Sequence, residues 1–161
     1  MNYQECLNWI HSRLKFGIKP GLERMLWMLN ELGNPQNNLS AVHIVGTNGK
    51  GSTSHYISGF LQAHGLNVGL FTSPHIFSMT ERLKYNNEPV SEELFLKLFN
   101  ETYQKLTQAE CKLVQFEWLF VLALVYFQTV PVDVVVLEVG IGGLYDTTNI
   151  IPNKLAAVIT N

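Results

Sequence analysis

The spacing of apolar and polar positions predicts a chain in which helices and strands alternate. Apolar residues at helical spacing predict helices over about residues 3–14, 22–32 and 52–64, from Ser91 onward, and over 116–128. Runs rich in β-branched residues predict strands at 41–45, 67–71, 132–139 and 155–160. Parallel neighbours need a crossover connection, so this alternation favours a mainly parallel sheet with helices on its faces. The pattern therefore indicates the α/β class and three layers.

The stretch from Thr72 to about Pro89 departs from this alternation. It shows little periodicity and contains the turn signal Asn86-Asn87. We expect a long loop, and loops of this length are usually functional or disordered. Because it starts where a parallel strand ends, it should begin at the sheet edge where α/β proteins bind ligands.

A glycine-rich segment, Gly46-Thr47-Asn48-Gly49-Lys50-Gly51-Ser52-Thr53, joins the first predicted strand to the next helix. Its glycines let the backbone bend and approach an anion, and the new helix directs unpaired N–H groups to the same place. Lys50 adds a positive charge for terminal phosphates, and Ser52 or Thr53 offers a hydroxyl to Mg²⁺ or to a phosphate oxygen. The segment therefore predicts a phosphate-binding loop.

The common phosphate-loop pattern G-x-x-x-x-G-K-[ST] is not matched in full. Ile44 stands at the place of its first glycine, and Gly51 separates Lys50 from Ser52. The competing interpretation is a glycine-rich turn with a solvated lysine. We favour the phosphate loop because a flexible lysine between two glycines, after a buried strand, contributes nothing to packing.

A carboxylate ends the most strand-like run of the chain. Consecutive β-branched residues over 132–139 are typical of a strand buried on both faces, so this strand should be central in the sheet. Glu138 closes the run just before Gly140-Ile141-Gly142-Gly143. A charge at this edge is unfavourable unless a cation is present, which makes Glu138 a candidate metal ligand. The alternative is a solvated glutamate at a strand end.

Composition narrows the possible partners. The 161 residues are 47% hydrophobic, which is enough for a single core and one domain. The 11 basic residues are scattered and the net charge is −2, which argues against nucleic acid or an anionic membrane surface as a partner. Cys6 and Cys111 lack metal-ligand spacing, and no disulfide is expected. With no apolar signal region and no apolar run long enough to cross a bilayer, we expect a cytoplasmic protein.

The order and identity of several motifs resemble the folylpolyglutamate synthase/dihydrofolate synthase family of the Mur ligase superfamily. The resemblance rests on Gly21-Leu22-Glu23-Arg24, Gly46 to Thr53, Thr72 to His75, Glu81-Arg82 and Glu138 to Asn149. It implies a P-loop NTPase-like ATP-binding domain. It also implies that residues 1–161 are the N-terminal part of a longer ligase, an incomplete ATP-binding domain without the C-terminal ligase domain.

The resemblance also implies roles for particular residues, according to their positions in the family's motifs. Residues 46–53 would bind ATP, Lys50 and Glu138 would act in catalysis, and Ser73 with Glu138 would bind Mg²⁺. The residues implied at the folate or pterin are Lys19, Pro20, Gln115, Phe116, Glu117, Tyr145, Asp146 and Thr147. Leu144 departs from the family pattern G-G-R-L-D-x-T-N, in which many relatives carry arginine at this place, so no contact made by that arginine is carried over.

Physical alternatives remain for several of these positions. Residues 16–21 can also be interpreted as a linker between helices. Glu117 enters a helix, where the dipole favours a carboxylate whatever its function. Asp146 could accept hydrogen bonds from a pterin amino group and ring N–H, or it could cap an Asx-type turn. His55 and His75 show no partner in the sequence and are interpreted as structural.

By resemblance, the intact reaction phosphorylates a pteroyl carboxylate with MgATP, and the amino group of L-glutamate then attacks the acyl phosphate. The substrates would be dihydropteroate or a tetrahydrofolate together with L-glutamate, and the full-length ligase would be a monomer. Lys50, the loop N–H groups and Mg²⁺ would offset charge on the transferring phosphate, with no protein nucleophile. The 161 residues alone are expected to lack ligase activity, because catalysis needs all the reactants held together.

Two other classes of function stay open. A P-loop kinase or GTPase would share the loop at residues 46–53, but no Asn-Lys-x-Asp or Asp-x-x-Gly segment follows at a suitable place. A non-catalytic chain could instead bind a nucleotide or a pterin without turnover. An assay of glutamate-dependent ADP release separates both classes from a ligase.

Overall fold

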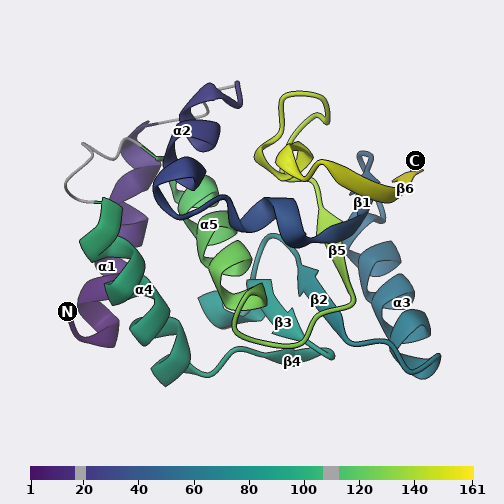
Figure 1. Ribbon diagram of the computed structural model, residues 1–161, viewed down its shortest axis with the longest axis horizontal. Coiled ribbons are helices and arrows are strands. Elements are labelled where there is room, and N and C mark those ends of the chain that lie inside the picture. The colour runs from purple at the N-terminus through teal and green to yellow at the C-terminus, as the bar shows by residue number, and fades with distance from the viewer. Residues whose placement is uncertain (17–20, 107–112) are drawn as a thin grey trace.

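A six-stranded sheet forms the centre of the fold (Figure 1). The computed structural model describes residues 1–16, 21–106 and 113–161. The strands lie in the order β4-β3-β2-β5-β1-β6. Their bounds are β1 Ser40–Val45, β2 Val68–Phe71, β3 Leu83–Tyr85, β4 Glu88–Pro89, β5 Val134–Glu138 and β6 Asn153–Ile159. Strands β2, β5, β1 and β6 are parallel, whereas β3 runs antiparallel to both of its neighbours.

Helices cover both faces of the sheet and give three layers. Their bounds are α1 Tyr3–Ser12, α2 Glu23–Glu31, α3 Lys50–Ala63, α4 Glu92–Leu106 and α5 Gln115–Phe127. Helix α3 packs on β1, β2 and β5, whereas α5 packs on the other face and is itself covered by α4 and α1 (Figure 1). The short 3-10 turns are η1 Arg13–Phe16, η2 Pro35–Asn38, η3 Met79–Arg82 and η5 Thr147–Ile150. The predicted α/β class and mainly parallel sheet are therefore confirmed.

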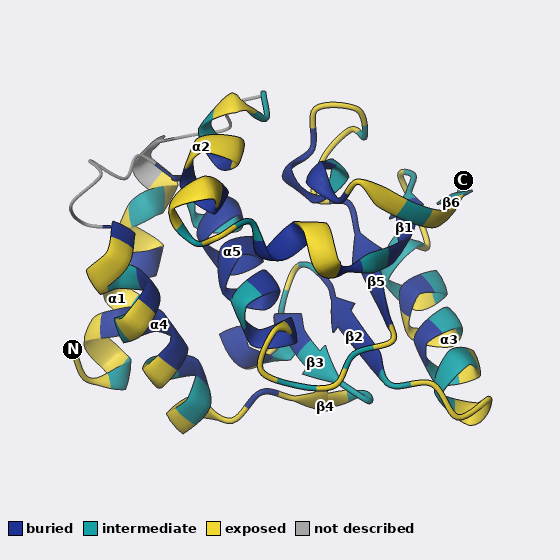
Figure 2. Cartoon of the chain, viewed as in Figure 1, coloured by how far each residue is buried: buried dark blue, intermediate teal, exposed yellow. Residues whose placement is uncertain are grey.

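The two faces of the sheet bury two separate apolar clusters. Successive residues of a strand point to opposite faces, so in β5 Val135 and Leu137 join the large cluster on the α5 side, and Val134 and Val136 join the small one beneath α3. Helix α5 is buried along almost its whole length (Figure 2). A fully buried aromatic or aliphatic side chain contributes about 1.5–3 kcal/mol, so this helix anchors the fold.

The four predicted strands are present, and their ends differ from the prediction by at most two residues. Strand β5 lies between β2 and β1, which confirms the central place predicted from its β-branched run. Every residue of β5 is buried, as expected for a strand covered on both faces.

The prediction of an irregular loop over residues 72–89 is wrong in its second half. Turn η3 leads into a hairpin in which β3 pairs with β2 and β4. Asn86 and Asn87 form the turn with φ angles of 50° and 64°, and Oδ1 of Asn86 accepts a hydrogen bond from the N–H of Val68. These strands span three and two residues, which is too short to show a period of two. The Asn-Asn pair was the only signal for them.

Helix ends follow local capping. A capping box begins α1, where Asn2 and Glu5 exchange hydrogen bonds with each other's backbone N–H. Helix α3 begins at Lys50, two residues before the prediction, because Gly49 takes a left-handed conformation with φ 77°. Lys50, Gly51 and Ser52 therefore form the first turn of the helix.

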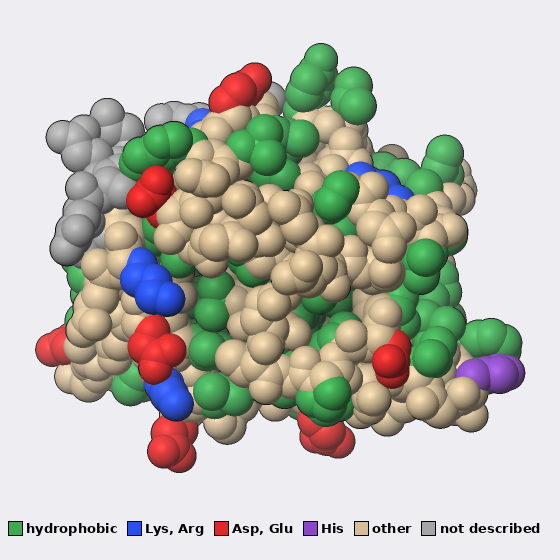
Figure 3. Space-filling model, in the orientation of Figure 1, with side chains coloured by type: hydrophobic (Ala, Val, Ile, Leu, Met, Phe, Trp, Pro, Cys, Tyr) green, Lys and Arg blue, Asp and Glu red, His purple; other side chains and the backbone are tan. Residues whose placement is uncertain are grey.

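Acidic and basic side chains are interspersed on the face of the molecule seen in Figure 3. In the described ranges, no helix combines the length and apolar character needed to cross a bilayer. Strand β6 forms one edge of the sheet, and Leu155 and Ile159 are 61% and 83% exposed. Lys19, Pro20 and Cys111 lie outside the described residues, so what the sequence predicts for them stays a prediction.

Candidate functional site

The glycine-rich loop lies at the carboxyl end of β1, where α3 begins, and the predicted strand, loop and helix are confirmed. Gly46 has φ 147°, and a Cβ built there would lie 2.1 Å from Oγ1 of Thr160. Gly49 supplies the second left-handed turn. Nζ of Lys50 lies 3.4 Å from the carbonyl oxygen of Thr47. The lysine therefore curls back over the loop, in the position from which it can reach a bound anion.

The N–H groups of the loop are used in two ways. Those of Thr47 and Asn48 donate to the carbonyl oxygen of Asn161, which fastens the loop to the end of β6. The first intrahelical bond of α3 comes from the N–H of Thr53, so the N–H groups of residues 50–52 precede it. These are the donors that an N-terminal helix turn offers to a phosphate.

Glu138 and Ser73 meet beside this loop. Glu138 ends β5, and Ser73 follows β2, the neighbouring strand. The N–H of Ser73 donates to Oε2 of Glu138 at 2.8 Å. A Cβ built on Gly51 would lie 3.6 Å from Oε1 of Glu138, so the carboxylate contacts the first turn of α3. The structure thus brings together the two residues predicted to bind metal.

The carboxylate of Glu138 is only 4% exposed, and its surroundings pull its ionisation in opposite directions. Burial is the main influence and raises its pKa. The N–H of Ser73 and the charges of Lys50, His55 and Arg82 lower that pKa, without overcoming the effect of burial. A cation bound here would favour the ionised carboxylate.

The residues at this edge fit a Mg²⁺ ion that shares its ligands with a bound phosphate. In the described part of the chain, no group of three or more His, Cys, Asp or Glu side chains could hold a metal alone. Mg²⁺ commonly takes one or two carboxylates and fills its other positions with water and phosphate oxygens. Glu138 offers the carboxylate, and the hydroxyl groups of Ser73 and Ser52 offer further hard oxygen atoms.

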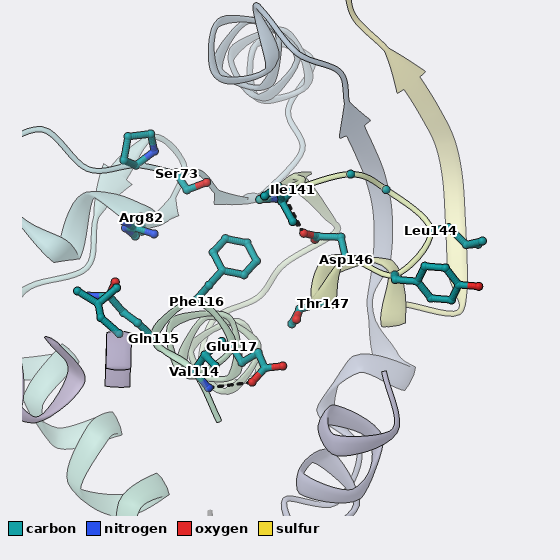
Figure 4. Close-up of a pocket in the computed structure, with 16 residues that line it drawn as sticks. Ser73, Arg82, Val114, Gln115, Phe116, Glu117, Ile141, Leu144, Asp146 and Thr147 are labelled. Atoms are coloured by element: carbon teal, nitrogen blue, oxygen red, sulfur yellow. Dashed lines mark hydrogen bonds between the residues drawn. The ribbon is translucent and has the colours of Figure 1, made fainter. Parts of the chain in front are cut away.

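A cavity of about 640 Å³ opens on the other side of Ser73 (Figure 4). The ring of Phe116 projects into it and packs edge-on against Phe71, with ring centroids 5.5 Å apart. A Cβ on Gly140 would lie 2.6 Å from this ring, so only glycine fits beneath it. Six of the predicted folate residues line the cavity: Gln115, Phe116, Glu117, Tyr145, Asp146 and Thr147. The fold therefore brings two distant segments of the predicted pocket together.

Asp146 holds the loop that forms one wall of the cavity. Its Oδ2 accepts from the N–H groups of Gly140 and Ile141, at 3.1 and 3.0 Å. Its Oδ1 accepts from the N–H and the hydroxyl of Thr148 and so caps η5. The Asx-type cap left open by the sequence is therefore present. A pterin would have to share oxygen atoms that already accept from the protein.

This wall is tied to the central sheet through a buried histidine. Nε2 of His43, in β1, lies 2.7 Å from Oγ1 of Thr148. Because the Thr148 hydroxyl donates to Asp146, the histidine is the donor to Thr148 and carries its proton on Nε2. Burial is the largest influence on the pKa of His43 and lowers it, the charge of Lys154 lowers it further, and Asp146 opposes both. His43 thus stays neutral and locks the loop in place.

Glu117 has two structural partners at the floor of the cavity. Its Oε2 accepts from the N–H of Val114 at 2.9 Å, which caps the start of α5. Both of its oxygen atoms also bind the guanidinium of Arg24, from α2. Glu117 is 2% exposed, so this ion pair is largely desolvated. Arg24 therefore brings the start of α2 to the floor of the cavity, a contact that was not predicted from the sequence.

Gln115 and Tyr145 line the cavity together with Leu144. The side-chain amide of Gln115 lies 3.2 Å from Nδ1 of His11. Tyr145 and Leu144 are 66% and 70% exposed.

No functional role was predicted for Arg82, and His75 was interpreted as structural. Arg82 lines the cavity, and its Nε donates to Nδ1 of His75 at 2.9 Å. His55 also has partners, since its ring nitrogens lie near the carbonyl oxygen of Gly51 and Nζ of Lys84. Both histidines therefore have hydrogen-bond partners that were not visible in the sequence. Their partners come from other segments, which a local pattern does not reveal.

Comparison with known proteins shows which family this chain resembles. No family model matches the chain. It is 43% identical over 164 residues to the dihydrofolate synthase/folylpolyglutamate synthase of Bacillus subtilis, an alignment that covers 99% of this chain. It is 40% identical over 166 residues to the folylpolyglutamate synthase of Lacticaseibacillus casei. Over nearly its whole length, this chain matches part of the folylpolyglutamate synthase/dihydrofolate synthase sequences. It spans 38% of the length of each of these two relatives.

Solved structures of this family share the fold. An FPGS–AMPPCP–folate complex superposes with a TM-score of 0.90 at 38% identity, over 99% of this chain and 40% of that chain. The Mycobacterium tuberculosis folylpolyglutamate synthase complexed with ADP gives a TM-score of 0.89 at 33% identity, over 98% of this chain and 36% of that chain. The fold of the described residues is therefore that of the family's ATP-binding domain.

Proposed function

We propose that this chain forms the nucleotide-binding and pterin-binding part of an ATP-dependent ligase. The ligase would add L-glutamate to dihydropteroate or to folylpolyglutamates through an acyl phosphate. The observation that carries the proposal is the contact between Ser73 and Glu138, because it places a phosphate loop and a large cavity on either side of one buried carboxylate. The names of the relatives, and the AMPPCP, ADP and folate in complexes of neighbouring structures, support it.

ATP is proposed to bind with its phosphates on residues 46–53. Lys50 and the N–H groups of the first turn of α3 would face the terminal phosphates and offset the charge that develops during phosphoryl transfer. Glu138 and Ser73 would hold a Mg²⁺ ion, which when bound neutralises part of the phosphate charge. Because Glu138 is fixed by the N–H of Ser73, its carboxylate needs no rearrangement to meet the ion.

The pterin-bearing substrate is proposed to occupy the cavity. The ring of Phe116 offers an aromatic surface, and the loop held by Asp146 forms the opposite wall. Thr147 lies at this wall, and Gln115 and Tyr145 also line the cavity. Lys19 and Pro20 remain proposed contacts by resemblance. In this pose the carboxyl end of the substrate faces Ser73 and the phosphate loop.

Catalysis is proposed to consist of holding the reacting groups in line and stabilising charge. A pteroyl carboxylate oxygen would attack the γ-phosphate and displace ADP, and the amine of glutamate would then displace phosphate from the acyl phosphate. No protein nucleophile is needed, so positioning by the chain supplies most of the effect. Residues 1–161 are proposed to act as the ATP-binding domain. A cytoplasmic location and a monomeric full-length ligase stay predictions.

Calorimetry with AMPPCP and Mg²⁺ tests the nucleotide site in the intact protein. Lys50→Ala is expected to weaken binding by at least about tenfold, because it removes a charge aimed at the phosphates. The matched control is Lys97→Ala, an exposed lysine on α4 far from the loop. Equal affinities in the wild type and in Lys50→Ala would overturn the assignment of the phosphate site.

A further inference from the structure

Arg82 is a buried cation at the edge of the cavity. It ends η3 directly before β3 and is only 9% exposed. Its side chain lines the cavity on the side of Ser73, across from Asp146 and Leu144 (Figure 4). Among the lining residues that the structure describes, it is the one cationic side chain. Arg82 therefore supplies the positive charge of the described cavity lining.

The carboxylates around the cavity are already occupied by other groups. Glu117 is paired with Arg24, and both oxygen atoms of Asp146 accept from the backbone of the cavity wall. Glu138 accepts from a backbone N–H and acts on Arg82 only as a neighbouring charge. Within the described ranges, no carboxylate forms an ion pair with Arg82. A buried cation in this situation is stabilised by an anion that arrives with the ligand.

A neighbouring loop fixes the orientation of the guanidinium. Nε of Arg82 donates to Nδ1 of His75 at 2.9 Å. The loop that carries His75 is fastened by Glu81, whose carboxylate accepts from the N–H groups of residues 76, 77 and 78 at 2.8–2.9 Å. A guanidinium held through Nε keeps its two terminal nitrogens for a planar oxyanion, in the fork geometry that suits a carboxylate.

We propose that Arg82, positioned by His75, binds the carboxylate of the pteroate-type substrate in the cavity. This inference rests on the proposed function and names a group that recognises the reacting end of the substrate. Arg82 lines the same cavity as Phe116 and lies on the side of Ser73, whose N–H meets Glu138 beside the phosphate loop. An acid group bound on this side of the cavity would face the guanidinium. Arg82 is thus a binding residue, and His75 acts through it.

The test compares two ligands that differ only at the acid group. Calorimetry on the intact protein measures the affinities of pteroic acid and of its uncharged carboxamide, for the wild type, Arg82→Met and the control Lys97→Met. The wild type is expected to prefer the acid by about tenfold to a hundredfold, the range for a charge-assisted bidentate contact. In Arg82→Met the acid should weaken to the level of the carboxamide, and the carboxamide should bind as it does to the wild type.

Nucleotide phosphate is the other oxyanion that a guanidinium could bind. AMPPCP affinity, measured without pteroate, separates the two ligands. It is expected to be equal in the wild type and in Arg82→Met. A variant that loses AMPPCP affinity and keeps its preference for the acid would overturn the proposal, because Arg82 would then serve the nucleotide.

His75 provides a second, independent variant pair. Asparagine places an amide oxygen close to the position of Nδ1, so His75→Asn should keep most of the preference for the acid. His75→Ala should lower that preference at least about threefold and leave carboxamide binding unchanged. Equal preferences in the wild type and His75→Ala would show that His75 does not position Arg82.

The outcomes separate this inference from the proposed function. If the wild type binds the acid and the carboxamide equally, Arg82 does not recognise the carboxylate, although the pterin pocket stands. If the wild type binds neither ligand, the proposed function itself fails and the inference fails with it. Arg82 has no carboxylate partner in the described ranges, so Arg82→Met should fold with an unchanged or higher melting temperature. If Arg82→Met does not fold, the preference of the wild type for the acid over the carboxamide still tests the proposal.

Discussion

The backbone N–H of Ser73 donates a 2.8 Å hydrogen bond to Oε2 of Glu138 and so joins the carboxyl ends of β2 and β5. The bond fixes a buried carboxylate without neutralising it. Lys50, His55 and Arg82 surround this carboxylate at longer range, yet burial still raises its pKa. An ion-binding site of this kind is least stable when empty, because the charge is desolvated before its partner arrives.

Glu138→Gln is expected to stabilise the ligand-free protein at neutral pH. The pKa of Glu138 is raised above its unfolded value, so its contribution to folding is fully present below about pH 4 and is lost as pH rises through the folded pKa. The amide does not ionise, so the advantage of the variant should grow with pH and reach about 1 kcal/mol near neutrality. Urea unfolding across this pH range measures it. The control Glu88→Gln, on exposed β4, should show no such trend.

The same variant should lose its response to Mg²⁺. Addition of Mg²⁺ with AMPPCP is expected to raise the melting temperature of the wild type more than that of Glu138→Gln, because the variant has lost the metal-binding carboxylate. Equal shifts in both proteins would place the ion elsewhere.

Gly140→Ala should disturb the pterin pocket through Phe116. The new methyl group would lie 2.6 Å from the ring, which must then leave its place against Phe71. We expect the protein to lose about 1–3 kcal/mol of stability and pteroate to bind more weakly. Gly143→Ala, in the same loop, meets only a methyl group of Val45 at 3.3 Å and serves as the control. Wild-type affinity for pteroate in Gly140→Ala would show that the ring position is unimportant.

His43→Gln should make stability less sensitive to acid. Because the pKa of His43 is lowered in the folded state, its contribution is fully present above its unfolded pKa of about 6.5 and is lost as pH falls through the folded pKa. Glutamine keeps a donor for Thr148 but does not titrate. The melting temperature should therefore change less between about pH 5 and pH 7 in His43→Gln than in the wild type. The exposed His64→Gln is the control, and parallel curves for wild type and His43→Gln would contradict the role of His43.

Cys6 should resist alkylation while the protein is folded. The side chain is fully buried, and burial raises the pKa of its thiol to about 12. At pH 8, only about one Cys6 side chain in ten thousand is then in the reactive thiolate form. Peptide mass mapping after iodoacetamide treatment should show modification of Cys6 only in denaturant. Complete modification in native buffer would show that α1 opens readily.

Elements with a long and regular pattern could be predicted from the sequence. The β-branched run ending at Glu138 specifies a central buried strand, and the spacing of Gly46, Gly49 and Lys50 specifies the loop and the start of a helix. These features depend on neighbours in the chain. The hairpin β3–β4 is too short for a period to emerge, so the sequence showed only its turn.

Contacts between distant segments could be predicted only in part. Resemblance placed residues 115–117 and 145–147 at one pocket, and the structure brings them together. It did not reveal that Arg24 pairs with Glu117, or that His75 holds Arg82. Those pairings depend on how α2 and the loop after β2 dock on the sheet. Propensity and periodicity carry no information about such docking.

The central claim is that this chain supplies the ATP and pteroate sites of one glutamate ligase. Its most direct test is ADP release by the full-length ligase in the presence of MgATP, dihydropteroate or a tetrahydrofolate, and L-glutamate. We expect ADP release to require all three substrates and to fall at least about a hundredfold in Lys50→Ala and in Glu138→Gln. ADP release that continues without the pteroate compound or glutamate, or that is unchanged in both variants, would contradict the claim.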